Sequence, residues 1–269
     1  MCIINTVKNT KLPVLLALIG FLSVLAILEE ASAQAVKELS SVALIETRQG
    51  LLLDDFEKDE PGTLPASWLN RDGDDIPSTY LGRDRQEYQY EIVEEDGNRF
   101  LRYIGSNAKH LNFPLRNRPN LDLIETPILR WRWRAHELPN GADERDDKLN
   151  DTAASVYIVY EMGKVLIQRV PKSIRFTWST TVPTGKGFDK LYGNQWIFVQ
   201  ETGRESVGQW VTEEVDLEAL YRKVFGDKVP QKPLALLILS DANSTQTSAA
   251  ADYDDFELIR REEASNPFQ

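Results

Sequence analysis

Two polar loops carry most of the side chains in this sequence that could bind a ligand. The first covers residues 143–151 and the second residues 241–245. Each adjoins an apolar strand pattern, so each is expected at the edge of a sheet, where a rigid element presents polar groups. If the two loops meet, they form a polar pocket. The predicted ligand-binding residues are Asp143, Arg145, Asp147, Asp151, Asp241 and Asn243.

A repeated tetrapeptide gives a second candidate site. Asp54-Asp55-Phe56-Glu57 recurs as Asp254-Asp255-Phe256-Glu257 near the other end of the chain. If the terminal strands lie side by side, carboxylates from both copies converge and could hold a structural Ca²⁺, which takes about six to eight oxygen ligands. The predicted metal ligands are Asp54, Glu57, Asp254 and Asp255. In the alternative interpretation, Phe56 and Phe256 are core residues flanked by solvated acids.

Catalysis, if there is any, must use carboxylates. The single cysteine is Cys2, and neither His110 nor His136 has the spacing of a zinc ligand or of a catalytic triad. A glycosidase needs two carboxyl groups about 5 to 10 Å apart across the sugar. The candidates for that pair are Asp143, Glu144, Asp147, Asp151 and Asp241. Whether the chain is an enzyme stays open at this stage.

Short strands must position these side chains. From Gly50 onward, apolar or alternating runs are separated by Gly, Pro, Asn and Asp, a pattern typical of all-β proteins. The predicted strands cover residues 51–56, 88–93, 100–104, 128–135, 155–161, 174–179, 196–200, 210–215, 234–240 and 253–260. The second and third of these form a hairpin around the turn at 96–98.

Alternation assigns faces to these strands. Trp131 and Trp133 share one face, expected in the core, and the three arginines at 130, 132 and 134 share the other. Trp178 is also expected in the core. Trp68 and Tyr192 lie in segments flanked by Pro or Gly and are expected at the surface.

One helix is predicted at residues 217–225, capped by Asp216 and ended by Gly226. A single helix among so many strands does not make a parallel α/β sheet. We therefore expect an all-β fold: an antiparallel two-sheet β-sandwich, jelly-roll-like, with one short helix. The expected organisation is a signal peptide at 1–33, a polar leader at 34–49, the sandwich at 50–262 and a flexible tail at 263–269.

The first residues predict export. Lys8 and Lys11 precede an apolar run over residues 12–28, and Ala31-Ser32-Ala33 is a small-x-small cleavage pattern. A retained anchor is the alternative, although about 17 apolar residues are at the lower limit for a span. After cleavage no cysteine and no stable membrane span would remain, and the location would be periplasmic or secreted. The net charge of -11 argues against nucleic acid as a partner.

Several segments resemble one bacterial exported family. They are Trp131-Arg132-Trp133-Arg134, residues 138–145, residues 150–160, and residues 239–245 with 251–256. The family is catalogued as domain of unknown function 3047, and the resemblance runs from about 52 to 260. Two residues depart from its pattern: Ser155 stands where an arginine is usual, and Ala242 where a second acidic or polar residue is usual. The resemblance implies fold and export and assigns no activity.

Together these features favour a binding module for a carbohydrate-like or other small polar ligand. Flat aromatic side chains with Asp, Asn and Arg are the general means of fixing such ligands. A carboxylate-dependent glycoside-cleaving enzyme is one alternative. An envelope interaction protein without a small ligand is the other.

Overall fold

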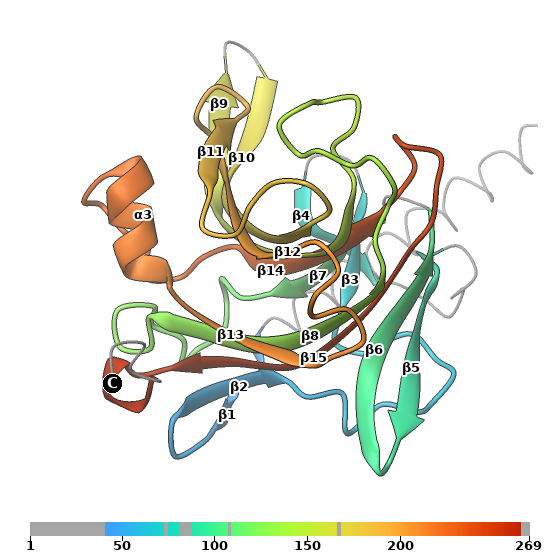
Figure 1. The fold of residues 1–269 in the computed structure, drawn as a ribbon. Helices are drawn as coiled ribbons and strands as arrows, with labels where there is room; N and C mark the ends of the chain where they lie inside the picture. The colour runs from blue at the N-terminus through green and yellow to red at the C-terminus, as the bar shows by residue number, and fades with distance from the viewer. Residues whose placement is uncertain (1–40, 73–74, 81–87, 107–108, 166–167, 265–269) are drawn as a thin grey trace, which may run out of the picture.

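The computed structural model describes residues 41–72, 75–80, 88–106, 109–165 and 168–264. Its strands form two sheets (Figure 1). The seven-stranded sheet contains β1 (Ile45–Glu46), β2 (Gly50–Asp54), β5 (Tyr90–Glu95), β6 (Asn98–Gly105), β8 (Ile128–Glu137), β13 (Val211–Asp216) and β15 (Ala249–Ile259). The eight-stranded sheet contains β3 (Leu69–Asp72), β4 (Asp75–Tyr80), β7 (Leu111–Pro114), β9 (Thr152–Val165), β10 (Gln168–Ser179), β11 (Gly187–Lys190), β12 (Gln195–Thr202) and β14 (Ala235–Asp241).

Strand β15 organises the seven-stranded sheet. One edge of β15 pairs with β8, and β8 pairs with the edge strand β13. The other edge pairs with β6 near the start of β15 and with β2 near its end, and the hairpin partners β5 and β1 follow. Segments from both ends of the chain therefore lie side by side, as the blue β2 and the red β15 show in Figure 1.

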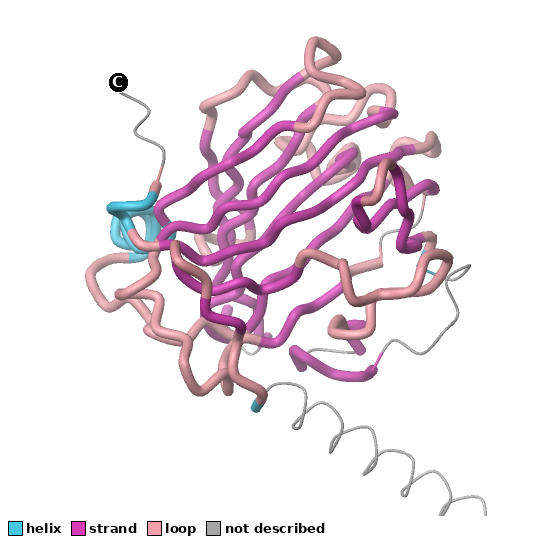
Figure 2. Tube along the Cα trace, turned by 90° about the horizontal axis from the view of Figure 1, so that it is seen from below, coloured by secondary structure: helices cyan, strands magenta, loops and turns pink. Residues whose placement is uncertain are grey.

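The core lies between the two sheets. Trp131 and Trp133 of β8 are fully buried, and their rings lie 5.5 Å from Phe176 and 6.0 Å from Trp178 of β10. These distances join the inner faces of opposite sheets, so the predicted alternation of β8 is confirmed. The arginines of β8 take the outer face. The all-β, two-sheet prediction is thereby confirmed, and Figure 2 shows strand over most of the described chain.

The one predicted helix is α3 (Leu217–Phe225). The Asp216 carboxylate accepts the Ala219 N–H over 2.8 Å, which satisfies one of the donors left free in the first turn. Gly226 follows with φ of 97°, a conformation that favours glycine. A short 3-10 helix, η1 (Arg261–Glu263), lies beyond β15. No helix in the described residues is long and apolar enough to cross a membrane.

Two features differ from expectation. The strands β1, β3, β4, β7 and β11 were not predicted, because runs of two to six residues carry little periodicity. In addition, β12 pairs parallel to β10, the one parallel pair among the described strands. The chain reverses twice between them, at residues 180–186 and 191–194, so β12 inserts between β10 and β11 in the direction of β10.

The prediction that Trp68 lies at the surface is wrong. It is fully buried, stacks on Phe56 at 6.0 Å, and its indole N–H donates to Asp54 over 2.7 Å. Burial of this ring is favourable because the carboxylate satisfies its one polar atom. Tyr192, by contrast, is 89% exposed as expected. The predicted signal peptide, residues 34–40 of the leader and most of the tail lie outside the described residues.

Candidate functional site

The first polar loop, residues 143–151, turns three of the predicted ligand-binding side chains outward. Asp143 and Arg145 pair with each other, with 2.6 Å between Oδ2 and Nη2. Asp147 pairs with Lys190 of β11 at 2.5 Å and is 86% exposed. These three side chains therefore form surface ion pairs at the rim of the loop.

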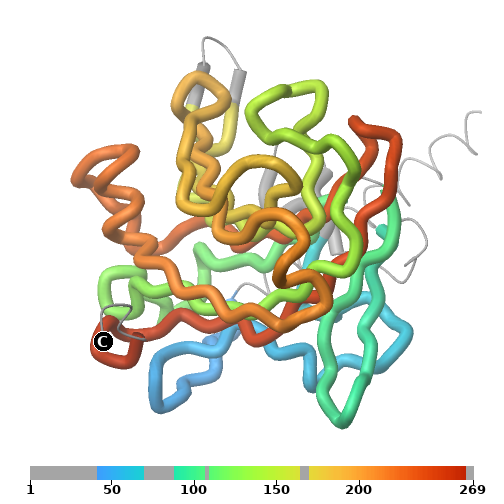
Figure 3. Tube along the Cα trace, in the orientation of Figure 1, coloured from blue at the N-terminus to red at the C-terminus, as the bar shows by residue number. Residues whose placement is uncertain are grey.

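The two polar loops meet, which is the condition that the sequence set for a polar pocket. Asp151 is fully buried, and its two carboxylate oxygens accept the backbone N–H groups of Ser244 and Thr245. In Figure 3 the loops after residues 141 and 241 lie at the same end of the sandwich. The carboxylate of Asp241, at the end of β14, accepts the N–H of Asn243 over 3.1 Å. The Asn243 side chain points to the surface.

Arg175 of β10 lies beside these loops on the outer face of the eight-stranded sheet. It is only 2% exposed, donates to Ser155 Oγ over 2.9 Å and to Asn150 Oδ1 over 2.8 Å, and its guanidinium lies 5.5 Å from the Tyr157 ring centroid. Its hydrogen-bond acceptors within the described residues are all uncharged. Ser155, which departs from the family pattern, thus binds a guanidinium from the neighbouring strand.

Glu144 is the one side chain of the acidic stretch 143–147 that is fully buried. Its Oε2 accepts a hydrogen bond from Ser179 Oγ over 2.6 Å, and Thr177 Oγ1 lies 3.4 Å from Oε1. Thr177 also lies 3.4 Å from Nη2 of Arg175. The hydroxyls of β10 therefore connect a buried carboxylate to a buried guanidinium and hold the loop onto the sheet.

Asp241 is the acid of the two loops whose pKa is raised toward neutral pH. Burial raises the pKa of its carboxyl to about 6, and the negative charge of Asp151 adds to the rise, whereas the Asn243 N–H and the Arg175 charge oppose it. No described side chain forms an ion pair with Asp241. We call the following four residues the Asp241 cluster: Asn150, Tyr157, Arg175 and Asp241.

Sequence reasoning missed Arg175 as a site residue. The signal was the alternation in residues 174–179, which places Arg175, Thr177 and Ser179 on the face opposite Phe176 and Trp178. The sequence alone does not show which residues lie beside this polar face. Only strand pairing reveals them, since Arg175 lies opposite Tyr157 in the ladder between β10 and β9.

The first acid of each tetrapeptide is held by hydrogen bonds from other residues of the protein. Asp54 accepts hydrogen bonds from the Trp68 indole and the Phe56 N–H, and Asp254 accepts from Arg132 over 2.6 Å and from Asn98 over 2.9 Å. Phe56 and Phe256 are both fully buried and contact each other edge to face at 6.2 Å. The terminal strands do lie side by side, and the phenylalanines are core residues, as in the alternative interpretation.

The other two predicted metal ligands are also engaged. Glu57 accepts the N–H of Arg99 over 2.9 Å, and Asp255 Oδ2 lies 2.7 Å from Arg132 Nε. In the part of the chain that the structure describes, no group of three or more His, Cys, Asp or Glu side chains is placed to hold a metal ion. The calcium site stays a prediction.

The arginines on the outer face of β8 are paired with the acids of β15. Arg134 contacts Asp252 at 2.6 Å, Arg132 contacts Asp254 at 2.6 Å, and Arg130 contacts Glu257 at 3.4 Å. The alignment of the two strands places each acid beside an arginine. The pKa of Asp252 is lowered, because hydrogen bonds from His136 and Arg102 outweigh the effect of burial. This face is therefore a ladder of ion pairs.

Trp210, just before the edge strand β13, covers part of the ladder. The guanidinium carbons of Arg132 and Arg134 lie 4.8 Å and 4.7 Å from its ring centroid, and Phe100 contacts it edge to face at 5.3 Å. Guanidinium groups stack favourably on indole faces. The aromatic ring thus orients two arginines of β8.

Comparison with solved structures finds distant similarity to sugar-binding and sugar-cleaving proteins. A family 11 carbohydrate-binding module of a Clostridium thermocellum cellulase is 12% identical, with a TM-score of 0.39, over 84% of this chain and 99% of the module. A family 30 module from the same organism is 12% identical, with a TM-score of 0.38, over 76% and 95%. A family 12 xyloglucanase from Bacillus licheniformis is 11% identical, with a TM-score of 0.37, over 75% and 97%. No curated protein matches the sequence.

The family comparison is specific. The model of the family described as "Protein of unknown function (DUF3047)" matches residues 77–257, which include β8, both polar loops and most of β15. The segments that carry the resemblance in the sequence all fall within the match. With residues 77–257 of 269 matched, this chain belongs to the DUF3047 family of proteins of unknown function.

Proposed function

We propose that this protein binds a hydroxyl-rich, carbohydrate-like ligand at the Asp241 cluster and that it does so in the periplasm or outside the cell. The cluster combines a carboxylate, a guanidinium and a phenol from one sheet face with the amide of Asn150 from the adjoining loop. Such groups fix sugar hydroxyls in general, because each hydroxyl both donates and accepts a hydrogen bond. The proposed location rests on the predicted export signal.

The state of Asp241 is the observation that carries the proposal. The residue is only 7% exposed, and its carboxylate lacks an ion pair with any described residue, although Arg175 lies close enough to affect its pKa. A carboxylate withdrawn from water without a strong partner is unfavourable, and a ligand hydroxyl would supply the missing donor. Both carboxylate oxygens of Asp151 and of Glu144 already accept hydrogen bonds from the protein, whereas the hydrogen bond from the Asn243 N–H to Asp241 uses Oδ1.

The cluster is held rigidly, as a binding site requires. Arg175 is fixed by Ser155 and Asn150, and Asn150 precedes the buried Asp151 that joins the two loops. Little conformational entropy would be lost on binding, because the side chains are ordered before the ligand arrives.

Glycoside cleavage is the second candidate, and one observation favours it. A carboxyl with a pKa of about 6 can act as a general acid near neutral pH, and Asp241 has that property while Asp151 lies near enough to raise its pKa. Cleavage differs from binding in a measurable way, because only an enzyme releases product.

The experiment is thermal melting of the purified protein against a panel of soluble glycans, with a parallel assay for reducing sugar. We expect at least one glycan to raise the Tm of the wild type and of the control Asp227→Asn, whose carboxylate is 95% exposed beyond α3. Asp241→Asn should lose the rise, since it keeps the shape but changes the charge.

Each other outcome contradicts the proposal. A rise that Asp241→Asn retains in full would place the ligand elsewhere. Released product that disappears in Asp241→Asn would identify an enzyme. No response to any glycan would favour an envelope interaction protein.

A further inference from the structure

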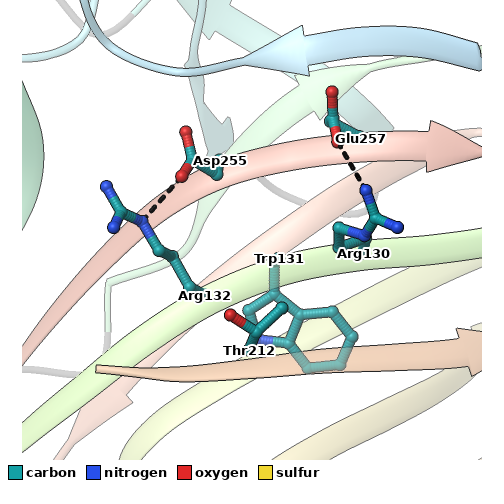
Figure 4. Close-up of a pocket in the computed structure, with 6 residues that line it drawn as sticks. All are labelled: Arg130, Trp131, Arg132, Thr212, Asp255 and Glu257. Atoms are coloured by element: carbon teal, nitrogen blue, oxygen red, sulfur yellow. Dashed lines mark hydrogen bonds and ion pairs between the residues drawn. The ribbon is translucent and has the colours of Figure 1, made fainter. Parts of the chain in front are cut away.

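The seven-stranded sheet carries a hollow on its outer face, on the opposite sheet from the Asp241 cluster. Its volume is about 320 Å³, at the small end of the range for ligand sites, which is about 300 to 1,000 Å³. The hollow lies across β8, β13 and β15, as Figure 4 shows. It is lined by Arg130, Trp131, Arg132, Thr212, Asp255 and Glu257. We call it the β8–β15 hollow.

Both arginines of the hollow already contact carboxylates. Arg130 donates to Gln49 Oε1 over 2.6 Å and to Glu214 Oε1 over 2.8 Å, in addition to its contact with Glu257. Arg132 donates to Asp254 and Asn98 and stacks on Trp210. An anionic ligand would have to displace a carboxylate from one of these arginines. The hollow is therefore a poor site for an anion.

The acids of the hollow keep hydrogen-bonding capacity. Asp255 and Glu257 each direct one oxygen to an arginine, and Figure 4 shows the second oxygen of each turned away from that arginine. The Asp255 side chain is 48% exposed, and the Thr212 hydroxyl lies on the same surface. Burial raises the pKa of both carboxyls, with Arg132 and Arg130 opposing the rise. Hydroxyl donors from a ligand would satisfy these oxygens.

A bulge in β15 builds this arrangement. The alignment of β15 with β8 shifts between Asp254 and Glu257, and Asp255 has φ of 51°. A bulge redirects a side chain. Here Phe256 enters the core, while Asp255 is directed to Arg132. Positive φ is uncommon outside glycine, and aspartate is one of the residues that adopt it most readily, so Asp255 suits the bulge.

The charges lining the hollow balance, with Arg130 and Arg132 against Asp255 and Glu257. Two guanidiniums would repel a cation. Among the described residues, no three His, Cys, Asp or Glu side chains are grouped so that they could hold a metal ion. The class of ligand that remains is a neutral molecule with several hydroxyl groups. We propose that the β8–β15 hollow is a second ligand site that binds one hydroxyl-rich ring through Asp255, Glu257 and Thr212.

The test is ¹H–¹⁵N NMR of the full protein titrated with three probes: myo-inositol, cis-1,2-cyclohexanediol and cyclohexanol. We expect myo-inositol to shift the amide signals of residues 130–132, 212 and 255–257, the diol to shift them less, and cyclohexanol not at all. The series separates hydroxyl recognition from general apolar contact, because the ring is the same size throughout.

Two variants locate the effect. In Asp255→Asn and Glu257→Gln, binding of myo-inositol should be about tenfold weaker, since one hydrogen bond to a charged group contributes about 1.5 kcal/mol or more. Asparagine tolerates positive φ well, so Asp255→Asn keeps the bulge. The spectrum of each variant also reports whether it is folded. Asp227→Asn is the control and should bind as the wild type does.

This inference is independent of the Asp241 cluster, and the experiment separates the two. Asp241→Asn should leave the myo-inositol shifts at residues 130–132 and 255–257 unchanged. The proposal is overturned if no probe shifts these amides, if cyclohexanol shifts them as strongly as myo-inositol, or if both hollow variants bind myo-inositol with unchanged affinity.

Discussion

The backbone N–H of Thr245 donates to the buried carboxylate of Asp151 over 2.6 Å, across 94 residues of sequence. The second oxygen of the same carboxylate accepts the Ser244 N–H over 3.2 Å. One side chain therefore joins the two polar loops, and the position of the Asp241 cluster depends on it.

Replacing Asp151 should loosen this junction. We expect Asp151→Ala to lower the free energy of unfolding by about 1 to 3 kcal/mol, because two N–H groups lose a charged acceptor. Urea unfolding measures the change. The matched control is Asp147→Asn in the same loop, where an exposed ion pair contributes at most about 1 kcal/mol. Equal effects of the two changes would contradict the role given to Asp151.

The aromatic contacts between the sheets should dominate stability. We expect Trp178→Ala to lower the free energy of unfolding by about 3 to 5 kcal/mol, because a large buried side chain leaves a cavity. Tyr192→Ala, at the tip of the turn between β11 and β12, should change it by no more than about 0.5 kcal/mol. Denaturant unfolding of both variants checks this, and a small loss in Trp178→Ala would contradict the described core.

Stability should fall as pH rises from about 5 to 8. Burial raises the pKa of Asp54 to about 7, and burial together with Glu201 raises that of Glu213 to about 7. Between about pH 4 and 7 the folded protein holds protons that the unfolded chain has released. The stability these groups contribute is therefore complete below about pH 4 and is lost as pH rises through 7.

Melting temperatures at pH 5.5 and 8 test this pH dependence. We expect a higher Tm at pH 5.5 and a smaller difference in Asp54→Asn, which has no proton to release. Below about pH 4 the trend reverses, because the pKa values of Asp252 and Glu218 are lowered and their stabilising charges are lost there. A Tm difference that is the same in Asp54→Asn and the wild type would exclude Asp54 as a cause.

Removal of calcium should leave the Tm unchanged. The carboxylates predicted as ligands instead contact Trp68, Arg99, Asn98 and Arg132. A metal that bound only the folded state would add about 2.7 kcal/mol at a hundredfold excess over its Kd. Melting with chelator and with added calcium measures this directly. A calcium-dependent rise that Asp255→Asn abolished would establish the predicted site.

The amino-acid sequence alone determined the secondary-structure elements that are long or that have clear turn or capping residues. The alternation of Trp131 and Trp133 with arginines, the hairpin around Asp96 and Gly97, and the helix between Asp216 and Gly226 were all readable, because side-chain period and turn chemistry act within a few residues. The family resemblance was also visible in the sequence, because it rests on short segments of neighbouring residues.

Partners distant in sequence were decided by the tertiary structure alone. Sequence predicted that two loops could meet, but it could not show that Asp151 joins them or that Arg175 lies over Tyr157 beside Asp241. The sequence predicted Trp68 at the surface, because nothing near it in the chain indicates that Asp54 accepts the indole N–H and so permits burial of the ring. Burial and hydrogen bonding depend on which strands become neighbours, and that choice is made by the fold as a whole rather than by any single segment.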